Sequence, residues 1–506
     1  MKELNKKNYT KKVAFKSHLF LFSFLCFLFI PYPSHSYYKF SPKVEQAYHE
    51  FLKLKISSGN KLINEALREE PQNDMAIFIA NYGDFLKLLI IEDVEAYEDL
   101  SKNEDERLEK LQQDKTSAAS PYYLFSQAEL KLQWGFVKLR YGDYMSGLWN
   151  IKEAYQLLKD NEKKYPLFLP NKKSLGLLNI LIGSVPQKYG PILTLAGIKG
   201  THAKGLKLLK EASEVENPFR LEAVIIKALA DAFILNEGTG KNEALDRECK
   251  TQPDDLLAIY VYATILHKHA KDEEALKIIP LAPASADYIA FPYIELLKGD
   301  LFLNKLDYAN SREHYMQFLQ KNIGLNYIKD ANYKLFLSYW LNNEEAQAEK
   351  ILAKVISEGE TQFDADKYAL KFAETRNFPD KVLMKSRLLC DGGYYQQSLA
   401  LISNYAPTTK KDSLELNYRK ARIYHGMEKY PEAIALYKQT IKNSSGSAYY
   451  FAPSSSLQLG YIYRKQNNKE AAKQYFLEVL SYEDYEYKNS IETKAKAGLN
   501  ELGKAP

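Results

Sequence analysis

The sequence predicts an all-α fold in which pairs of antiparallel helices stack into a solenoid. After Ser36, apolar residues recur at three- and four-residue steps, without the sustained alternation that marks strands. Short turn clusters separate the helical segments at fairly regular intervals. Small residues also recur in pairs twelve positions apart, and such internal periodicity is typical of repeat architectures.

The first 36 residues have the three parts of a secretory signal peptide. Six lysines precede residues 19–30, an apolar run of 12, and Pro31 and Pro33 follow that run. Ser34 and Ser36 supply the small residues of a cleavage site. Because the apolar run is too short to span a bilayer comfortably, we expect cleavage and export, to the periplasm of a two-membrane bacterium. Without cleavage, the segment would anchor the protein to the membrane.

The positive charge of the chain lies in this segment. The formal net charge is +5, and residues 1–36 carry six lysines against Glu3, so the rest of the chain is neutral. Nucleic-acid binding depends on clustered excess cations, so nucleic acid is not predicted as a partner. Three cysteines, Cys26, Cys249 and Cys390, form no C-x-x-C pair, which excludes a disulfide framework or a zinc motif. Cys249 and Cys390 could be bridged, although two separate buried thiols are the favoured alternative.

Residues 251–506 carry the strongest repeat pattern. Leu459-Gly460-x-x-Tyr463, followed by Ala472-x-x-x-Phe476, matches the skeleton of a tetratricopeptide repeat. In such a hairpin only a small side chain fits where the two helices cross, and stacked hairpins bury the apolar faces that one hairpin leaves open. The small residues assigned to crossings here are Ala263 and Ala275, Gly299 and Ser311, Ser386 and Ser398, Ala421 and Ala433, and Gly460 and Ala472, with a weaker unit at Phe336 and Ala348.

Residues 37–250 are interpreted as an N-terminal helical repeat region. Its clearest unit pairs Gly135 with Gly147 around a turn at 142–144. The chain therefore divides into a signal peptide (1–36), this region (37–250) and a tetratricopeptide-repeat array (251–506).

Several stretches also resemble one family of tetratricopeptide-repeat proteins. They are residues 134–144, 174–179, 184–186, 197–205, 449–453 and 485–491. The family is the one grouped with the inclusion-body clearance protein of the mitochondrial outer membrane, together with its bacterial relatives. The resemblance implies an all-helical, adaptor-like protein without assigned catalytic residues, from a group linked to protein quality control and lipid handling. The export signal departs from that family and argues against a cytosolic or mitochondrial-surface location here.

No motif for catalysis, metal binding or cofactor binding emerges. Residues 237–241 suggest a phosphate loop, but Leu235 replaces its first glycine and Asn242 its Ser or Thr. His267 and His269, two apart on a helix, point to different faces and cannot easily share a metal. We therefore predict no enzyme activity, no cofactor and no metal.

The concave face of the solenoid is the predicted binding site. In each first helix, the residues three before, one after and four after the small position turn away from the partner helix. The predicted groove residues are Tyr333, Trp340, Arg387, Tyr418, Arg422, His425, Tyr461 and Arg464. Arginine forks suit carboxylates and tyrosines give rigid contact area, so the predicted partner is a protein or peptide with an acidic segment or a free carboxy terminus.

Two other functions remain open at this stage. The apolar stretch 175–198 could form an amphipathic hairpin on a membrane surface, which would make the protein lipid-handling, although burial between repeats is the favoured interpretation. A cryptic enzyme would need a convergent acid, base and nucleophile, which the spacing does not reveal.

Overall fold

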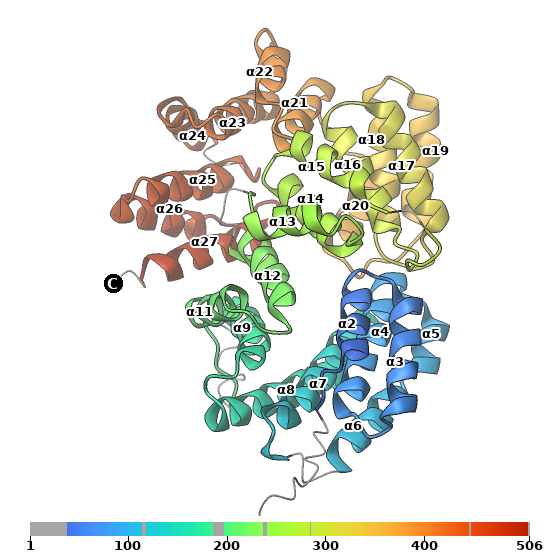
Figure 1. Ribbon diagram of the computed structural model, residues 1–506. Coiled ribbons are helices and arrows are strands. Elements are labelled where there is room, and N and C mark those ends of the chain that lie inside the picture. Colours follow the sequence, from blue (N-terminus) through green and yellow to red (C-terminus); the bar gives the residue numbers. More distant parts are fainter. Residues whose placement is uncertain are drawn as a thin grey trace, which may run out of the picture.

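The described helices form a continuous array of consecutive pairs that curves into two successive superhelical turns. The computed structural model describes residues 38–113, 118–185, 197–235, 240–283, 285–444 and 447–503, so the predicted signal peptide lies outside the described residues. Across these ranges the chain is mostly helical and contains no β-strand, which confirms the all-α prediction. In Figure 1 the blue to green helices form the lower part of the molecule, and the yellow to red helices form the upper part.

The first superhelical turn, called here the N-terminal turn, comprises the described residues from 38 to 235. Its helices are α2 (Pro42–Leu52), α3 (Ile56–Glu69), α4 (Asp74–Ile91), α5 (Val94–Leu100), α6 (Asn103–Gln113), α7 (Pro121–Arg140), α8 (Tyr144–Lys164), α9 (Leu169–Ser184), α11 (His202–Glu214), α12 (Arg220–Leu229) and the π-helix η3 (Ala230–Leu235).

The second turn, called here the C-terminal turn, follows α13 (Glu243–Thr251). Its helices are α14 (Leu256–Lys268), α15 (Asp272–Ile278), the short η4 (Ile279–Leu281), α16 (Tyr293–Asn304), α17 (Tyr308–Lys321), α18 (Ile328–Leu341), α19 (Glu345–Ser357), α20 (Asp364–Thr375), α21 (Lys381–Asp391), α22 (Tyr395–Ile402), α23 (Lys410–Gly426), α24 (Tyr430–Asn443), α25 (Phe451–Lys465), α26 (Lys469–Ser481) and α27 (Lys488–Leu502). Consecutive helices pair along both turns, for example α7 with α8, α16 with α17, and α25 with α26.

The small residues assigned from sequence lie where paired helices meet. A Cβ added at Gly135 would stand 3.1 Å from the carbonyl oxygen of Gly147. One added at Gly460 would stand 2.5 Å from the ring of Phe476. The corresponding positions on the other hairpins are also fully buried: Ala263, Ala275, Ser311, Ala348, Ser386, Ser398, Ala421, Ala433 and Ala472. Added bulk therefore has no room at these crossings.

Two of the crossings differ from the others in the groups that meet there. The Ser386 and Ser398 hydroxyls are hydrogen-bonded at 2.9 Å, so the pair satisfies its own polar groups inside the core. At Gly299 an added Cβ would stand 2.4 Å from the ring of Tyr315, which fills the space that the glycine leaves.

Each of these hairpins turns at the same register. The residue seven positions after the first small residue has a positive φ; these residues are Gly142, Ala270, Leu306, Asn343, Gly393, Glu428 and Asn467. The next amide donates to the carbonyl oxygen five residues earlier, as in the pair Asn468 and Tyr463 at 2.9 Å. This is the helix-ending arrangement in which a left-handed residue lets the chain fold back over the last turn. Only two of the seven residues are glycine, so packing of the paired helices imposes the turn.

The interior of the N-terminal turn contains a buried ionic cluster. Lys173 on α9 is 1% exposed and forms ion pairs with Glu129 on α7 (2.7 Å) and Glu222 on α12 (2.8 Å). Tyr48 and Tyr82 each donate a hydrogen bond of 3.0 Å to Glu222. Helices α2, α4, α7, α9 and α12 thus converge on one buried ionic cluster. The start of α12 returns to α2, which closes this turn on itself.

A second polar junction joins the two turns. Glu92, which ends α4, accepts hydrogen bonds from Arg140 of α7, Tyr293 of α16 and Asn326 of the α17–α18 connection. Glu92 is 7% exposed, so this carboxylate is shared by both turns within the core. Lys55 adds an ion pair of 2.7 Å to Asp254 just before α14.

Candidate binding cavity

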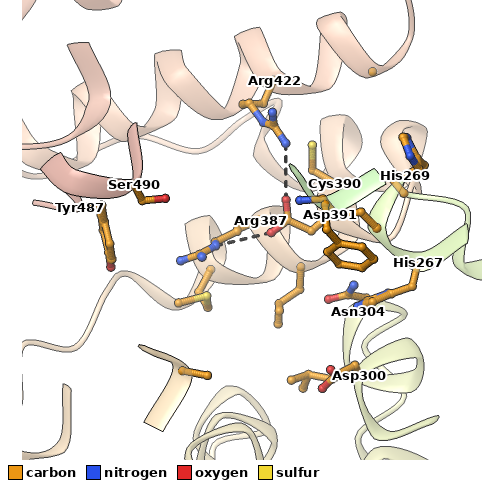
Figure 2. A pocket seen from close by; sticks show the side chains of 18 of the residues that line it. His267, His269, Asp300, Asn304, Arg387, Cys390, Asp391, Arg422, Tyr487 and Ser490 are labelled. Atoms are coloured by element: carbon orange, nitrogen blue, oxygen red, sulfur yellow. Dashed lines mark ion pairs between the residues drawn. The ribbon is translucent and has the colours of Figure 1, made fainter. Parts of the chain in front are cut away.

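A large cavity lies inside the C-terminal turn. Its volume is about 1710 Å³, and its walls come mainly from α14, α16, α18, α20, α21, α23 and the N-terminal end of α27. Most of these are the first helices of their pairs, the set whose exposed positions the repeat pattern assigns to the concave face. Figure 2 shows side chains from α14, α16, α21, α23 and α27 facing this space.

Four of the eight predicted groove residues line the cavity. They are Tyr333 on α18, Arg387 on α21, and Arg422 and His425 on α23. The side chains of Arg387 and Arg422 are 39% and 34% exposed, so both guanidinium groups are accessible to the water of the cavity.

The other four predicted groove residues lie elsewhere. Trp340 and Tyr418 are 8% and 6% exposed and belong to the aromatic core between neighbouring hairpins. Arg464 forms an ion pair with Glu501 of α27 and lies over the ring of Tyr461, at 5.4 Å. Position within the repeat alone therefore does not determine which of these side chains line the cavity, because local packing removes half of them from it.

One carboxylate serves both cavity arginines. Arg387 Nε lies 3.5 Å from one oxygen of Asp391, and an Arg422 terminal nitrogen lies 3.8 Å from the other. In Figure 2, Arg387 of α21 and Arg422 of α23 both point toward Asp391, and Tyr487, just before α27, and Ser490 of α27 lie on the other side of Arg387. Both contacts are long for ion pairs, so each guanidinium keeps donors free for a ligand.

Several other charged groups in the cavity are held in ion pairs. Lys334 forms ion pairs of 2.8 Å with both Asp300 and Asp330. Lys465 forms one of 2.8 Å with Glu428. These contacts join neighbouring hairpins and stabilise the walls of the cavity.

The histidines of the cavity have different roles. His267 Nδ1 lies 2.8 Å from Asp272, a fully buried carboxylate that also accepts a hydrogen bond from Asn304 at 3.0 Å. Burial, together with the positive charge of Arg422, lowers the pKa of His425 to about 3, so His425 is neutral and adds no charge to the cavity.

The two cysteines of the described chain are free and buried. Burial raises the pKa of Cys249 to about 12 and that of Cys390 to about 11, which leaves both as protonated thiols with little nucleophilic character. Among the described residues no three His, Cys, Asp or Glu side chains group in a way that could hold a metal ion.

Sequence reasoning missed Lys268, which ends α14 and lines the cavity. Lys268 comes one residue after His267, the last groove position of its repeat unit, so the repeat pattern does not select it.

Two stretches singled out from sequence are described only in part. Residues 175–184 belong to α9, and Leu175, Leu178 and Ile180 in it are buried, whereas residues 186–196 lie outside the described residues. Residues 236–239 of the phosphate-loop-like segment also lie outside them. Within the described ranges no helix combines the length and apolar character needed to cross a membrane.

Comparison with known proteins supports the repeat type. The family model of the tetratricopeptide repeat matches residues 453–484, which contain most of α25 and α26 and the pair Gly460 and Ala472. No curated protein matches the chain. The resemblance to the inclusion-body clearance group stays a prediction. With its consecutive helical hairpins and its matched repeat, the chain is supported as a repeat protein of the tetratricopeptide type, a fold typical of protein-interaction scaffolds.

Proposed function

We propose that this protein is an exported, non-enzymatic scaffold that binds a segment of a partner protein in the cavity of its C-terminal turn. The observation that carries the proposal is the cavity itself, whose volume of about 1710 Å³ lies inside a ring of stacked hairpins. Small-molecule pockets usually enclose about 300–1,000 Å³, so this space suits a larger ligand such as a peptide segment.

The lining suits a peptide with an acidic or carboxy-terminal group. Arg387 and Arg422 present guanidinium groups that share one carboxylate, and planar guanidinium forks bind carboxylates through paired hydrogen bonds. Tyrosines surround them and offer rigid, amphipathic contact area; those lining the cavity are Tyr333, Tyr368, Tyr395, Tyr430, Tyr485 and Tyr487.

The side chains of the cavity favour binding over catalysis. Cys390, the thiol in the lining, has its pKa raised to about 11 by burial and is a poor nucleophile. His267 lies 2.8 Å from Asp272, and among the described residues no hydroxyl or thiol nucleophile is hydrogen-bonded to it. A non-enzymatic role is therefore the simpler proposal.

A peptide-display screen tests the binding proposal. The full chain is screened against peptides with free and amidated carboxy termini, beside an Arg387→Gln/Arg422→Gln double variant and the matched variant Arg464→Gln. Since Arg464 is already paired with Glu501 away from the cavity, we expect it to leave binding unchanged, whereas the double variant loses it. Equal binding by all three proteins would overturn the proposed site.

Export is proposed from the lysine-rich and apolar segment at residues 1–36. The segment is fused to a reporter enzyme that is active only outside the cytoplasm, and the mature amino terminus is sequenced. Reporter activity with cleavage after Ser36 is the expected result. An inactive reporter would contradict export.

A further inference from the structure

One aromatic ring in the cavity wall is exposed and held in an unusual backbone conformation. Tyr487 comes just before α27, lines the cavity and is 46% exposed. Its φ is 63°, in the left-handed region, which is rare and costly for a bulky side chain. Such a conformation persists only where the surrounding structure imposes it, and residues of this kind are frequent at ligand-binding positions.

The ring of Tyr487 is positioned by a series of printed contacts behind it. Buried Arg419 of α23 forms an ion pair of 2.7 Å with Glu415 and donates a hydrogen bond of 3.0 Å to the Tyr450 hydroxyl. The ring centres of Tyr450 and Tyr487 are 5.3 Å apart, at an interplanar angle of 87°. Tyr368 of α20 also contacts the Tyr487 ring, at 5.9 Å. The ring is therefore in place before a ligand arrives, which lowers the entropic cost of binding.

Tyr327 shows how a ring in this conformation is completed elsewhere in the same chain. Tyr327 comes just before α18, as Tyr487 comes just before α27, and its φ is 62°. The ring of Tyr327 is stacked on that of Phe363, with centres 5.2 Å apart and an interplanar angle of 14°. Among the described residues no ring lies parallel to that of Tyr487. A flat side chain of a ligand can therefore take the place at Tyr487 that Phe363 takes at Tyr327.

The same wall carries the arginines that the proposed function assigns to the ligand's carboxylate. Arg419 and Arg422 are three residues apart on α23, so they are neighbours on the helix surface, with Cβ atoms about 5–6 Å apart. Arg419 thus belongs both to the support of Tyr487 and to the helix that presents Arg422. In Figure 2, Tyr487 lies on the other side of Arg387 from Asp391. A ring at Tyr487 and a carboxylate at the two arginines are neighbouring positions in one cavity.

We propose that the open face of Tyr487 is a subsite for an aromatic side chain, so that the cavity selects peptides whose carboxy-terminal residue is aromatic. The proposal rests on the proposed function, because it places this ring beside the carboxylate bound by Arg387 and Arg422. A carboxy-terminal aromatic residue carries both groups on one α-carbon, which suits two neighbouring subsites. The proposal adds the side chain that the repeat pattern did not reveal.

An aromatic ring suits this subsite better than a cation or an aliphatic chain. Arg387 and Arg422 share one carboxylate, that of Asp391, so a cationic side chain would be repelled. An aliphatic side chain would bury apolar area but would lose the ring–ring interaction, which adds to burial. The ring separations already present at Tyr487, 5.3 and 5.9 Å, lie within the range of about 4.5–7 Å that aromatic pairs prefer.

Peptide pools that differ only in their last residue test the subsite. Short peptides of mixed upstream sequence end in phenylalanine, in cyclohexylalanine, which is bulky and apolar but not aromatic, or in alanine, each as free acid and as amide. The full chain is dialysed against each pool, and bound peptide is quantified by mass spectrometry. We expect the phenylalanine acids to bind about fivefold more tightly than the cyclohexylalanine acids. Equal binding of these two pools by the unaltered protein would overturn the subsite.

Variants of Tyr487 locate the preference. Tyr487→Phe keeps the ring and should keep the preference for phenylalanine, whereas Tyr487→Leu keeps apolar bulk and should abolish it. Tyr144→Leu is the matched control, because Tyr144 is 58% exposed at the start of α8, and it should bind as the unaltered protein does. Circular dichroism checks each fold. A folded Tyr487→Leu protein that still prefers phenylalanine would refute the assignment.

Cross-linking provides a second measurement in which a ring stays at the position. Photoreactive p-benzoylphenylalanine replaces Tyr487 in one protein and Tyr144 in another, and each is irradiated with the phenylalanine acids. We expect cross-links to the last residue of the peptide from position 487 and none from position 144. Absence of such cross-links at position 487, with the peptides bound, would place the terminal ring elsewhere and overturn the subsite.

The subsite and the proposed function fail separately. Arg387→Gln/Arg422→Gln should lose the preference for acids over amides and keep the preference for phenylalanine, and Tyr487→Leu should do the reverse. Preference for acids without preference for phenylalanine in the unaltered protein would overturn the aromatic subsite alone. Preference for phenylalanine without preference for acids would contradict the carboxylate site, and absence of binding to every pool would contradict both.

Discussion

The two superhelical turns are built from the same kind of helical hairpin, but the cations in their interiors differ in exposure and in pairing. In the N-terminal turn a lysine sits at the centre, Lys173, with a side chain 1% exposed and two glutamates beside it. In the C-terminal turn the central cation Arg387 has a side chain 39% exposed and one distant carboxylate. A central cation therefore supports the fold in one turn and is available to a ligand in the other.

The difference follows from how each turn closes. The N-terminal turn brings α12 back onto α2, where Tyr48 packs against Phe219 with ring centres 5.1 Å apart. The C-terminal turn closes through Tyr368 on α20 and Tyr487 before α27, whose rings are 5.9 Å apart, and it encloses the cavity of about 1710 Å³. Several of its first helices therefore face the water of that cavity.

The largest expected effect is at the centre of the N-terminal turn. Lys173→Met should lower the free energy of unfolding by about 3–5 kcal/mol, because it leaves Glu129 and Glu222 buried without their cation. Urea denaturation followed by circular dichroism measures this, with Lys350→Met as the exposed control. A loss smaller than that of the control would show that the interior of this turn is open to water.

The junction between the turns should have the next largest effect. Glu92→Gln keeps the shape but removes the charge that Arg140, Tyr293 and Asn326 contact, at a cost of about 1.5–3 kcal/mol. We also expect the turns to unfold less cooperatively, so that Trp134 fluorescence and far-ultraviolet circular dichroism no longer report one transition. The exposed Glu95→Gln is the control. Coincident transitions at unchanged stability would mean that the junction does not couple the turns.

A bulky substitution where two paired helices cross should have the third largest effect on stability. Gly460→Leu should destabilise the protein by about 1–3 kcal/mol, because its Cβ alone would lie 2.5 Å from the buried ring of Phe476. Gly503→Leu is the matched control, since the nearest atom to a Cβ there is 3.8 Å away. Thermal unfolding compares the two variants. An unchanged midpoint for Gly460→Leu would contradict the assignment of Gly460 to a close helix crossing.

The smallest expected effect is at the centre of the C-terminal turn. Arg387→Gln should change the free energy of unfolding by less than about 1 kcal/mol, because its contact with Asp391 is long and exposed. The same denaturation experiment measures it beside Lys173→Met. If Arg387→Gln lowered the free energy of unfolding as much as Lys173→Met does, Arg387 would be as important to the fold as Lys173, and the two interiors would not differ in this respect.

The sequence predicted the repeat units well because their crossings are local. Gly460 and Ala472 are twelve residues apart, and a hairpin fixes their contact whatever the rest of the chain does. It also predicted which face is concave, and it named Arg387 and Arg422 on that face. Those positions follow from helical periodicity alone.

The composition of the cavity depends on contacts that no local pattern contains. Arg464 occupies the same repeat position as Arg422 but meets Glu501 of the added helix α27. Trp340 occupies a groove position but packs against Phe378, which follows α20 in the longest interval between hairpins. Lys268 at the end of α14 and Ser490 of α27 line the same cavity only because the array of hairpins curves. Curvature is a property of the whole array, so it cannot be deduced from one unit.

The left-handed residue at the end of each first helix indicates where substitutions could increase the stability of the protein. Ala270, Leu306 and Glu428 hold a conformation that costs a residue with a Cβ about 1–2 kcal/mol, and the packed helices on either side outweigh that cost. Replacing these residues with glycine would remove that cost and stabilise the protein without changing the cavity. The packing of the neighbouring hairpins, and not the loop residue, therefore sets the conformation of these turns.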